Sequence, residues 1–207
     1  MIVLKFIILA VVCYLLGSVN MAFFIGKLTK NIDLRTKGSG NLGSTNVLRV
    51  LGKRAAIITL VFDILKGVIA VWLGDMLFGG GLDTAGKMAG GLAVILGHNF
   101  PFYLHFKGGK GIATSCGIAF YLNPWAALVL LVVEFGIIFI TKYVSLASII
   151  NCVLYPFVVN FVRGEPCFDP YIWVLTVVLG AIALIRHWSN LKRLIQGNEN
   201  KTNFSKH

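Results

Sequence analysis

The segment IVLKFIILAVVCYLLGSVNMAFFIG, residues 2–26, is apolar over a length that can cross a lipid bilayer. A membrane-spanning helix needs roughly 20 mainly apolar residues, since each adds about 1.5 Å along the axis. Lys5 is the only charged residue in the segment, and no small-residue cleavage site followed by a polar chain comes after it. We therefore interpret the segment as a retained first helix and not as a cleaved secretory signal.

The same pattern recurs along a chain that is 57% apolar and only 13% charged. This composition lies far outside the range of soluble domains. Further apolar segments cover residues 55–78, 86–96, 112–122, 125–140, 144–162 and 171–185. The segments 86–96 and 112–122 are short for complete spans. We predict an all-α, polytopic integral membrane protein with about seven transmembrane helices, two of them short. Five complete crossings with two partial ones is the alternative.

Lysine and arginine gather in alternate connections between these segments. Short cytoplasmic loops accumulate such residues, so residues 27–54, 97–111, 141–143 and 186–207 are predicted to be cytoplasmic. The opposite side then carries Asp75, Asp83, Lys87, Arg163, Glu165 and Asp169. This pattern predicts an outside N-terminus and a cytoplasmic C-terminus. We expect one membrane-embedded domain over residues 1–207, with a flexible cytoplasmic tail over residues 196–207.

The first basic loop contains GSGNLGSTNVLRVLGKR, residues 38–54. Glycines let backbone N–H groups turn toward a bound anion, and nearby cations supply the opposite charge. Thr45 or Asn46 would cap a helix that begins there, and a helix N-terminus favours an anion. A capped turn, or a basic loop attracted by anionic lipid, is the alternative. We favour a phosphate or polar-substrate site, with the candidates Ser39, Gly40, Asn41, Thr45, Asn46 and Arg49.

The second glycine-rich loop is GHNFPFYLHFKGGKGIAT, residues 97–114. It is not a Walker A nucleotide-binding motif, because Leu104 stands where that motif needs a glycine six residues before Lys110. The candidate anion-binding residues are Lys107, Gly108, Gly109, Lys110 and Thr114; a flexible basic turn is the alternative. His98 and His105 flank the loop. They are expected to pack or hydrogen-bond, since no carboxylate or thiol cluster accompanies them.

Two further segments carry polar groups at predicted cytoplasmic helix ends. In KYVSLAS, residues 142–148, Ser145 is a substrate-binding residue, a plain helix cap, or a nucleophile that would need a base. In IRHWSNLKRLIQGNE, residues 185–199, four polar residues fall within an arc of about 120° on a helix: Arg186, His187, Asn190 and Arg193. Anchoring at the membrane interface is the alternative for this face. His187 is the strongest general-base candidate in the chain.

Three charged residues lie well inside predicted spans, away from the span ends. Asp63 and Lys66 are three residues apart, so they are expected to pair on one helix face. Glu134 has no evident local partner. It is expected to support a cation on another helix or to be present as a neutral acid.

The motifs GSGNLGSTN, GHNFPFYLHFKGGKGIAT, KYVSL and HWSNLKRLIQGNE, in this order, resemble the bacterial acyl-phosphate-dependent glycerol-3-phosphate acyltransferase family, often called PlsY. The resemblance covers nearly the whole chain; Ser44 departs from it, where the family commonly has alanine. It implies transfer of a fatty acyl group from acyl phosphate to the 1-hydroxyl of sn-glycerol 3-phosphate. The products would be 1-acylglycerol 3-phosphate (lysophosphatidate) and phosphate, for phospholipid biosynthesis. It also implies a multi-pass protein of the bacterial inner membrane, with seven helices and a site facing the cytoplasm.

By motif position, the resemblance implies six catalytic residues: Ser39, Arg49, Lys107, Ser145, His187 and Asn190. The expected substrate- and phosphate-binding residues are Gly40, Asn41, Thr45, Asn46, Gly108, Gly109, Lys110, Thr114 and Arg193. An acyl phosphate is an already activated anhydride, so no metal or cofactor is expected. Either His187 or a substrate phosphate would be the base, and the resemblance favours the phosphate.

The resemblance excludes acyl-CoA and acyl carrier protein as donors. The chain also lacks the HxxxxD motif of enzymes that use those donors, because Tyr103, Lys110 and Lys192 stand five residues after its three internal histidines. The expected partners are acyl phosphate, glycerol 3-phosphate and membrane lipids, without nucleic acid, and the protein is expected to be a monomer.

Two other functions compete with an acyltransferase. A transporter for phosphorylated metabolites would need functional charge near the bilayer midplane, accessible from both sides, whereas the charge here clusters on one predicted face. A non-catalytic scaffold for anionic lipid would leave the small residues of the glycine-rich loops unexplained.

Overall fold

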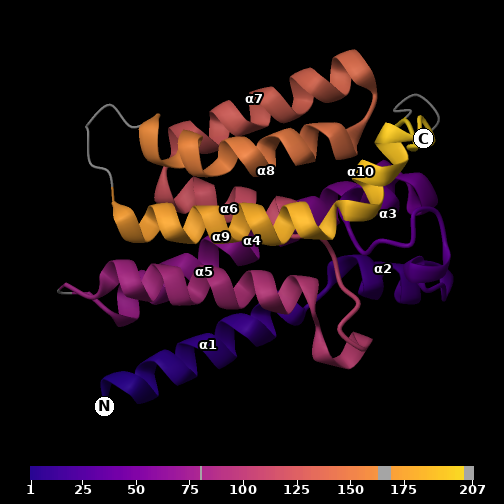
Figure 1. Cartoon of the computed structure of the whole chain (residues 1–207). Helices are drawn as coiled ribbons and strands as arrows, with labels where there is room; N and C mark the ends of the chain where they lie inside the picture. Colours follow the sequence, from indigo (N-terminus) through magenta and orange to yellow (C-terminus); the bar gives the residue numbers. More distant parts are fainter. Residues whose placement is uncertain (80, 163–168, 203–207) are drawn as a thin grey trace. The chain divides into compact units, whose positions relative to one another are not determined.

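The fold is described from a computed structural model, which covers residues 1–79, 81–162 and 169–202. Over these ranges the chain is helical and contains no β-strand (Figure 1). The helices are α1 (Ile2–Ser18), α2 (Met21–Lys30), η1 (Leu34–Thr36), α3 (Ser44–Leu51), α4 (Lys53–Leu77), α5 (Asp83–Asn99), η2 (Phe102–Leu104), α6 (Ile112–Leu122), α7 (Pro124–Thr141), α8 (Val144–Phe161), α9 (Pro170–Arg186) and α10 (Trp188–Ile195). The prediction of an all-α membrane protein is confirmed. Arg163 and Glu165, which were predicted on the side opposite the basic loops, lie outside the described ranges.

All seven predicted apolar segments are helical. Among the described residues, four stretches are long and apolar enough to cross a membrane: Ile2–Lys30, α4, α7 and α8. The pair α9 and α10 makes a fifth if it counts as one span, with a bend of 57°. The helix α6 has 11 residues, as short as expected, whereas α5 has 17 and extends beyond the predicted segment at both ends. The exact number of crossings and the sidedness stay predictions.

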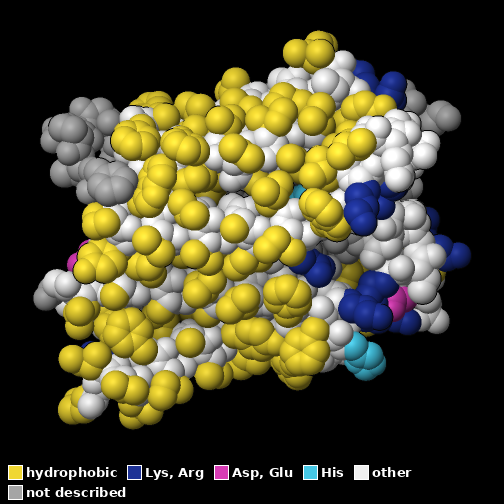
Figure 2. All heavy atoms as spheres, viewed as in Figure 1, with side chains coloured by type: hydrophobic (Ala, Val, Ile, Leu, Met, Phe, Trp, Pro, Cys, Tyr) yellow, Lys and Arg dark blue, Asp and Glu magenta, His cyan; other side chains and the backbone are white. Residues whose placement is uncertain are grey.

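The chain divides into two compact units, residues 1–118 and 119–206, which are described separately. The single domain expected from the sequence therefore stays a prediction. In each unit apolar side chains cover the flanks of the helices, and Lys and Arg gather toward the end that carries α2 and α3, or α10 (Figure 2). This separation of apolar flank and basic end is typical of helices that cross a bilayer.

In the first unit, α5 packs against both α1 and α4. Two glycines bring α1 and α5 into backbone contact: a Cβ at Gly17 would overlap the carbonyl of Val94, and one at Gly97 would overlap that of Tyr14. Small residues at such interfaces let membrane helices approach closely, which replaces the hydrophobic driving force absent in lipid.

The first apolar segment is broken between α1 and α2. Val19 is extended, and the side chain of Asn20 caps α2 by accepting a hydrogen bond of 3.0 Å from the N–H of Phe23. The break was not predicted. It places residues 21–26 of the segment in a separate helix, which ends at Lys30 in the basic loop.

In the second unit, α8 packs against α7 and α9, and α10 contacts both α8 and α9. Between the apolar segments 112–122 and 125–140, the side chain of Asn123 accepts from the N–H of Ala126 and thereby caps α7. Glu134 accepts hydrogen bonds from Ser148 Oγ at 3.0 Å and from Asn151 Nδ2 at 2.7 Å. These donors are neutral, so of the two alternatives the structure does not bear out a cation on another helix, and a neutral acid stays a prediction.

Candidate functional site

Asn46 organises the first glycine-rich loop. Its side chain is 1% exposed, and its Oδ1 accepts from the N–H of Ser39 at 2.8 Å. Its Nδ2 donates to three backbone carbonyls at 3.0–3.1 Å, those of Leu34, Lys37 and Asn41. The amide thus fixes the backbone of residues 34–41, which precede α3. The structure gives Asn46 a supporting role, and its predicted contact with substrate stays a prediction.

The loop reaches α3 through a glycine and not through a side-chain cap. The N-cap is Gly43, without a side-chain hydrogen bond, so the predicted caps Thr45 and Asn46 are wrong. Gly38 and Gly40 have φ values of 59° and 72°, which residues with a Cβ rarely adopt. Within this frame Ser39 and Gly40 are exposed, and the remaining candidates, Asn41, Thr45 and Arg49, are half-buried.

The side chain of Arg35, just before the first glycine-rich loop, contacts the second loop at Leu104. Arg35 pairs with Asp33 at 2.6 Å, and its Nη1 donates to the carbonyl of Leu104 at 2.9 Å. The hydrogen bond from Arg35 and its charge hold the pKa of Asp33 below its ordinary value. Leu104 also packs with Leu34 and Leu42 in one buried cluster. The two predicted loops therefore lie side by side within the first unit.

The second loop is held mainly by its own backbone. Gly108 N–H donates to the carbonyl of Asn99 at 3.1 Å, and Gly109 N–H donates to that of His98 at 3.0 Å. Both glycines are buried, whereas Lys107 is exposed and Lys110 is half-buried. The loop thus exposes Lys107 beside a buried glycine backbone, while Lys110 is partly covered.

The same loop runs directly into α6. His105 and Phe106 have φ values of 56° and 58°, a strained region for residues with side chains, so the surrounding contacts must stabilise this turn. Thr114 lies in the first turn of α6, as predicted for a helix start, but its side chain is fully buried. Its predicted contact with phosphate stays a prediction.

Two candidate residues of the second unit, Asn190 and Arg193, contact Glu199. Its carboxylate accepts from Asn190 Nδ2 at 2.8 Å and from Arg193 Nε at 2.7 Å, and its side chain is 4% exposed. Burial raises the pKa of Glu199, but the hydrogen bonds from Asn190 and Arg193 outweigh it and leave the pKa below its ordinary value. The buried hydroxyl of Ser145, on the first turn of α8, contributes to this lowering. The third and fourth motifs therefore meet within this unit.

His187 occupies the bend between α9 and α10. Its side chain is buried, and Nδ1 donates to the carbonyl of Ala183 at 2.8 Å. In the neutral ring this bond places the proton on Nδ1 and makes Nε2 the basic nitrogen. The prediction of one continuous polar helix face is wrong, because Arg186 ends α9 while Asn190 and Arg193 belong to α10 beyond the bend.

The candidate residues thus form two groups, one in each unit. The first unit brings together the loops that carry Ser39, Arg49 and Lys107, and the second brings together Ser145, Asn190 and Arg193 with His187 next to them on the chain. Sequence reasoning missed Glu199, although it lies in the quoted fourth motif, and it counted Arg35 only as a loop charge. In the described ranges, no three His, Cys, Asp or Glu side chains gather to hold a metal ion.

The chain is similar in sequence to proteins of a known family. The sequence model of a family described as glycerol-3-phosphate acyltransferase matches residues 7–197. A relative of that name from Thermoanaerobacter sp. (strain X514) is 44% identical over 197 residues, which cover 94% of each chain. Another, from Clostridioides difficile (strain 630), is 42% identical over 205 residues, with 96% of each chain covered.

Two solved structures are also similar. One is a crystal structure of PlsY, an integral membrane glycerol 3-phosphate acyltransferase, in its glycerol 3-phosphate form. It has a TM-score of 0.87 and 39% identity, with 96% of each chain covered. The lysophosphatidic acid form of PlsY gives a TM-score of 0.85 and 37% identity over the same share of each chain.

Proposed function

The chain belongs to the glycerol-3-phosphate acyltransferase family, and on that premise we propose that it transfers a fatty acyl group from acyl phosphate to the 1-hydroxyl of sn-glycerol 3-phosphate. The single observation that carries the proposal is the pair of basic, glycine-rich loops joined through Arg35 and Leu104. Both proposed substrates carry a phosphate group. Two adjacent glycine-rich loops that carry lysine and arginine are suited to binding such groups at a membrane boundary.

The reaction needs no cofactor by its own chemistry. The 1-hydroxyl oxygen of glycerol 3-phosphate attacks the acyl carbonyl carbon and forms the new ester C–O bond. The bond from that carbon to the phosphate oxygen breaks, and the phosphate leaves with the electron pair. The hydroxyl proton passes to a substrate phosphate, which acts as the base. The products are lysophosphatidate, the molecule named for one form of the related structure, and inorganic phosphate.

We assign roles by charge and position. Arg49, Lys107 and Lys110 neutralise the phosphates and stabilise the charge that develops on the leaving group. His187 and Asn190 position glycerol 3-phosphate, and Ser145 donates a hydrogen bond to it. The protein lies in the bacterial inner membrane. The lipid-soluble donor enters the site from this membrane, while glycerol 3-phosphate enters from the cytoplasm.

The test is a donor comparison with purified protein in detergent or nanodiscs. Acyl phosphate, acyl-CoA and acyl carrier protein are offered separately with glycerol 3-phosphate. Lysophosphatidate is followed by mass spectrometry, and phosphate release is followed for acyl phosphate. We expect product only with acyl phosphate. Phosphate release without lysophosphatidate, or an equal rate with acyl-CoA, would overturn the donor assignment.

Sidedness is tested with single cysteines in a chain whose native cysteines are replaced. Lys53→Cys lies at the start of α4, near the basic loop, and Asp83→Cys lies at the start of α5, on the opposite predicted side. With a membrane-impermeant thiol reagent on spheroplasts, we expect labelling of Asp83→Cys alone. Labelling of Lys53→Cys in sealed cells would reverse the proposed orientation.

A further inference from the structure

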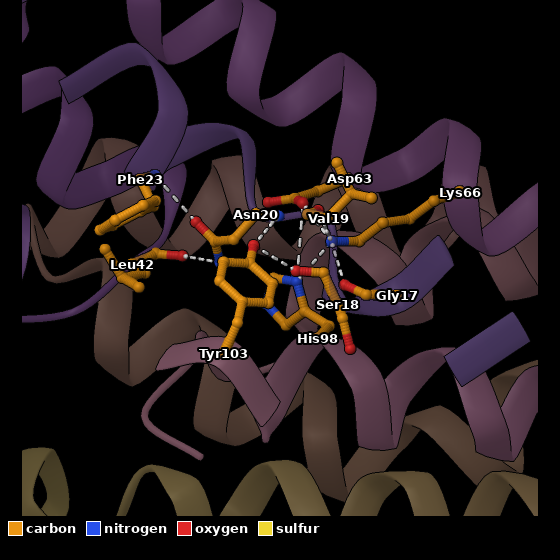
Figure 3. A network of polar contacts seen from close by, with 10 residues as sticks. All are labelled: Gly17, Ser18, Val19, Asn20, Phe23, Leu42, Asp63, Lys66, His98 and Tyr103. Atoms are coloured by element: carbon orange, nitrogen blue, oxygen red, sulfur yellow. Dashed lines mark hydrogen bonds and ion pairs between the residues drawn. The ribbon is translucent and has the colours of Figure 1, made fainter. Parts of the chain in front are cut away.

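Three ionisable side chains meet in the interior of the first unit. Asp63 and Lys66, both on α4, pair at 2.7 Å with side chains only 3% and 1% exposed, which confirms the predicted pair. The ring of His98, from the last turn of α5, lies with its Nδ1 2.8 Å from Lys66 Nζ and 3.5 Å from Asp63 Oδ1 (Figure 3). Burying charges is costly unless the surrounding geometry supplies further bonds. The further hydrogen bonds that these three side chains make therefore show which parts of the chain they stabilise.

Lys66 holds the end of α1. Its ammonium donates to the carbonyls of Gly17 at 3.2 Å and of Val19 at 3.3 Å, where α1 stops and α2 has not yet begun. A cation at a helix C-terminus satisfies carbonyls that have no partner within the helix and interacts favourably with the helix dipole. The lysine therefore stabilises the break in the first apolar segment. After that break, α2 leads to the first glycine-rich loop.

Lys66 Nζ contacts Nδ1 of His98 at 2.8 Å, one of four acceptor atoms around an ammonium group that carries three protons. In the neutral ring, a proton donated by Lys66 to Nδ1 requires the ring proton to be on Nε2. The Nε2 side of the ring lies against Gly109, where any Cβ would overlap it. The backbone carbonyl of His98 also accepts the N–H of Gly109 at 3.0 Å. One residue thus contacts the second loop through both its ring and its backbone.

We propose that Asp63, Lys66 and His98 form a positioning triad that holds the loop of residues 107–111 in its phosphate-binding conformation. Asp63 fixes Lys66, Lys66 fixes the ring of His98, and the ring forms the surface on which Gly109 packs. Lys107 and Lys110 flank Gly108 and Gly109, so a shift of Gly109 moves both cations. The inference deepens the proposed function, since it rests on the assignment of those lysines to substrate phosphate.

The decisive variant is His98→Asn. Its Oδ1 lies close to the position of His98 Nδ1, so it keeps an acceptor for Lys66, but it lacks the ring atoms that face Gly109. We expect the melting temperature to stay near that of the wild type while KM for glycerol 3-phosphate rises on the order of tenfold, with a smaller change in kcat. A residue that only supports the fold would lower the melting temperature or the active fraction and leave KM unchanged.

Two further variants extend the test. His98→Ala removes both the acceptor and the ring, and we expect it to lower stability as well as affinity. Lys87→Met is the matched control, because it removes a lysine that pairs with Asp75 and Asp83 at the other end of the same helices. We expect an unchanged KM for Lys87→Met.

Hydrogen exchange followed by mass spectrometry supplies a readout independent of turnover. In His98→Asn we expect faster exchange in peptides that contain Gly108 and Gly109, with unchanged exchange in the middle of α4. Wild-type exchange of the loop together with a wild-type KM would overturn the triad. A wild-type protein that fails to use acyl phosphate would instead overturn the proposed donor, and the exchange result would stand separately.

Discussion

Glu199 accepts a hydrogen bond of 2.8 Å from Asn190, and so joins the segment after α10 to one of the predicted catalytic side chains. The carboxylate also binds Arg193 and is nearly inaccessible to solvent. A second contact joins the same C-terminal segment to the end of α7, because the N–H of Thr202 donates to the carbonyl of Lys142 at 2.8 Å. The flexible tail expected over residues 196–207 stays a prediction as a whole. Residues 199 and 202 are nevertheless held, and residues 203–207 lie outside the described ranges.

Replacing Glu199 should therefore affect both stability and activity. In Glu199→Ala the buried amide of Asn190 and the guanidinium of Arg193 lose their acceptor, which costs about 1–3 kcal/mol of unfolding free energy. We expect a lower melting temperature in detergent and a lower kcat, since Asn190 is no longer oriented. Gln196→Ala, a change at an exposed position of the same segment, is the control and should stay within about 0.5 kcal/mol of the wild type. An unchanged melting temperature for Glu199→Ala would contradict the observed role of the carboxylate.

The same carboxylate predicts a pH dependence of stability. Folding lowers the pKa of Glu199 from its ordinary value near 4.5, so near that pH the unfolded chain binds more protons than the folded one. The stabilisation is complete above the unfolded pKa and is lost as the pH falls through the folded pKa. The difference in melting temperature between the wild type and Glu199→Gln should stay constant from pH 7 to about pH 5 and shrink as the pH is lowered further, below the ordinary pKa of the carboxyl group. A difference that does not shrink at any acidic pH at which both proteins remain folded would show that the charge of Glu199 contributes nothing.

The helices could be predicted from the sequence because membrane spans depend on the length and polarity of single segments. All seven apolar segments are helical, and the Asp63–Lys66 pair followed from its spacing along α4. The break at Val19 could not be predicted, because it depends on carbonyl bonds to a lysine 47 residues away. The bend at His187 likewise has no proline or glycine beside it as a local signal.

The sequence motifs of the candidate site could be predicted, but the contacts that each of their side chains makes could not. Small polar residues around glycines mark the first loop, yet the sequence does not show that Asn46 turns its amide inward to three carbonyls. Glu199 follows Arg193 by six residues, beyond the end of α10, so no helical periodicity connects the two. Such contacts arise where the chain folds back on itself, and periodicity carries no information about them.

Asn46 and Ser39 should respond differently to substitution. Asn46→Asp replaces a donor to three carbonyls with a carboxylate, which should destabilise the loop by about 1–3 kcal/mol and lower activity as a consequence. Ser39→Ala keeps the backbone N–H that donates to Asn46 and removes an exposed hydroxyl, so stability should not change while kcat/KM falls. Melting temperature and steady-state kinetics measured on the same preparations separate the two. Equal losses of stability would refute the assigned division of roles.

His187→Gln tests which group takes the proton of the glycerol 3-phosphate hydroxyl. Glutamine cannot titrate in this range but can place an amide near the position of Nε2, the basic nitrogen of the ring when Nδ1 donates to Ala183. If a substrate phosphate is the base, as we propose, turnover should fall only through weaker positioning, and the pH profile of kcat should keep the shape of the wild type. If the imidazole were the base, kcat would fall by roughly 10²–10⁴ and the acidic limb of the profile would disappear. The Ala183 carbonyl also loses its ring donor in this variant, so His187→Asn, which can keep a donor near Nδ1, is the matched control. Loss of the acidic limb in both variants would replace the phosphate by His187 as the base.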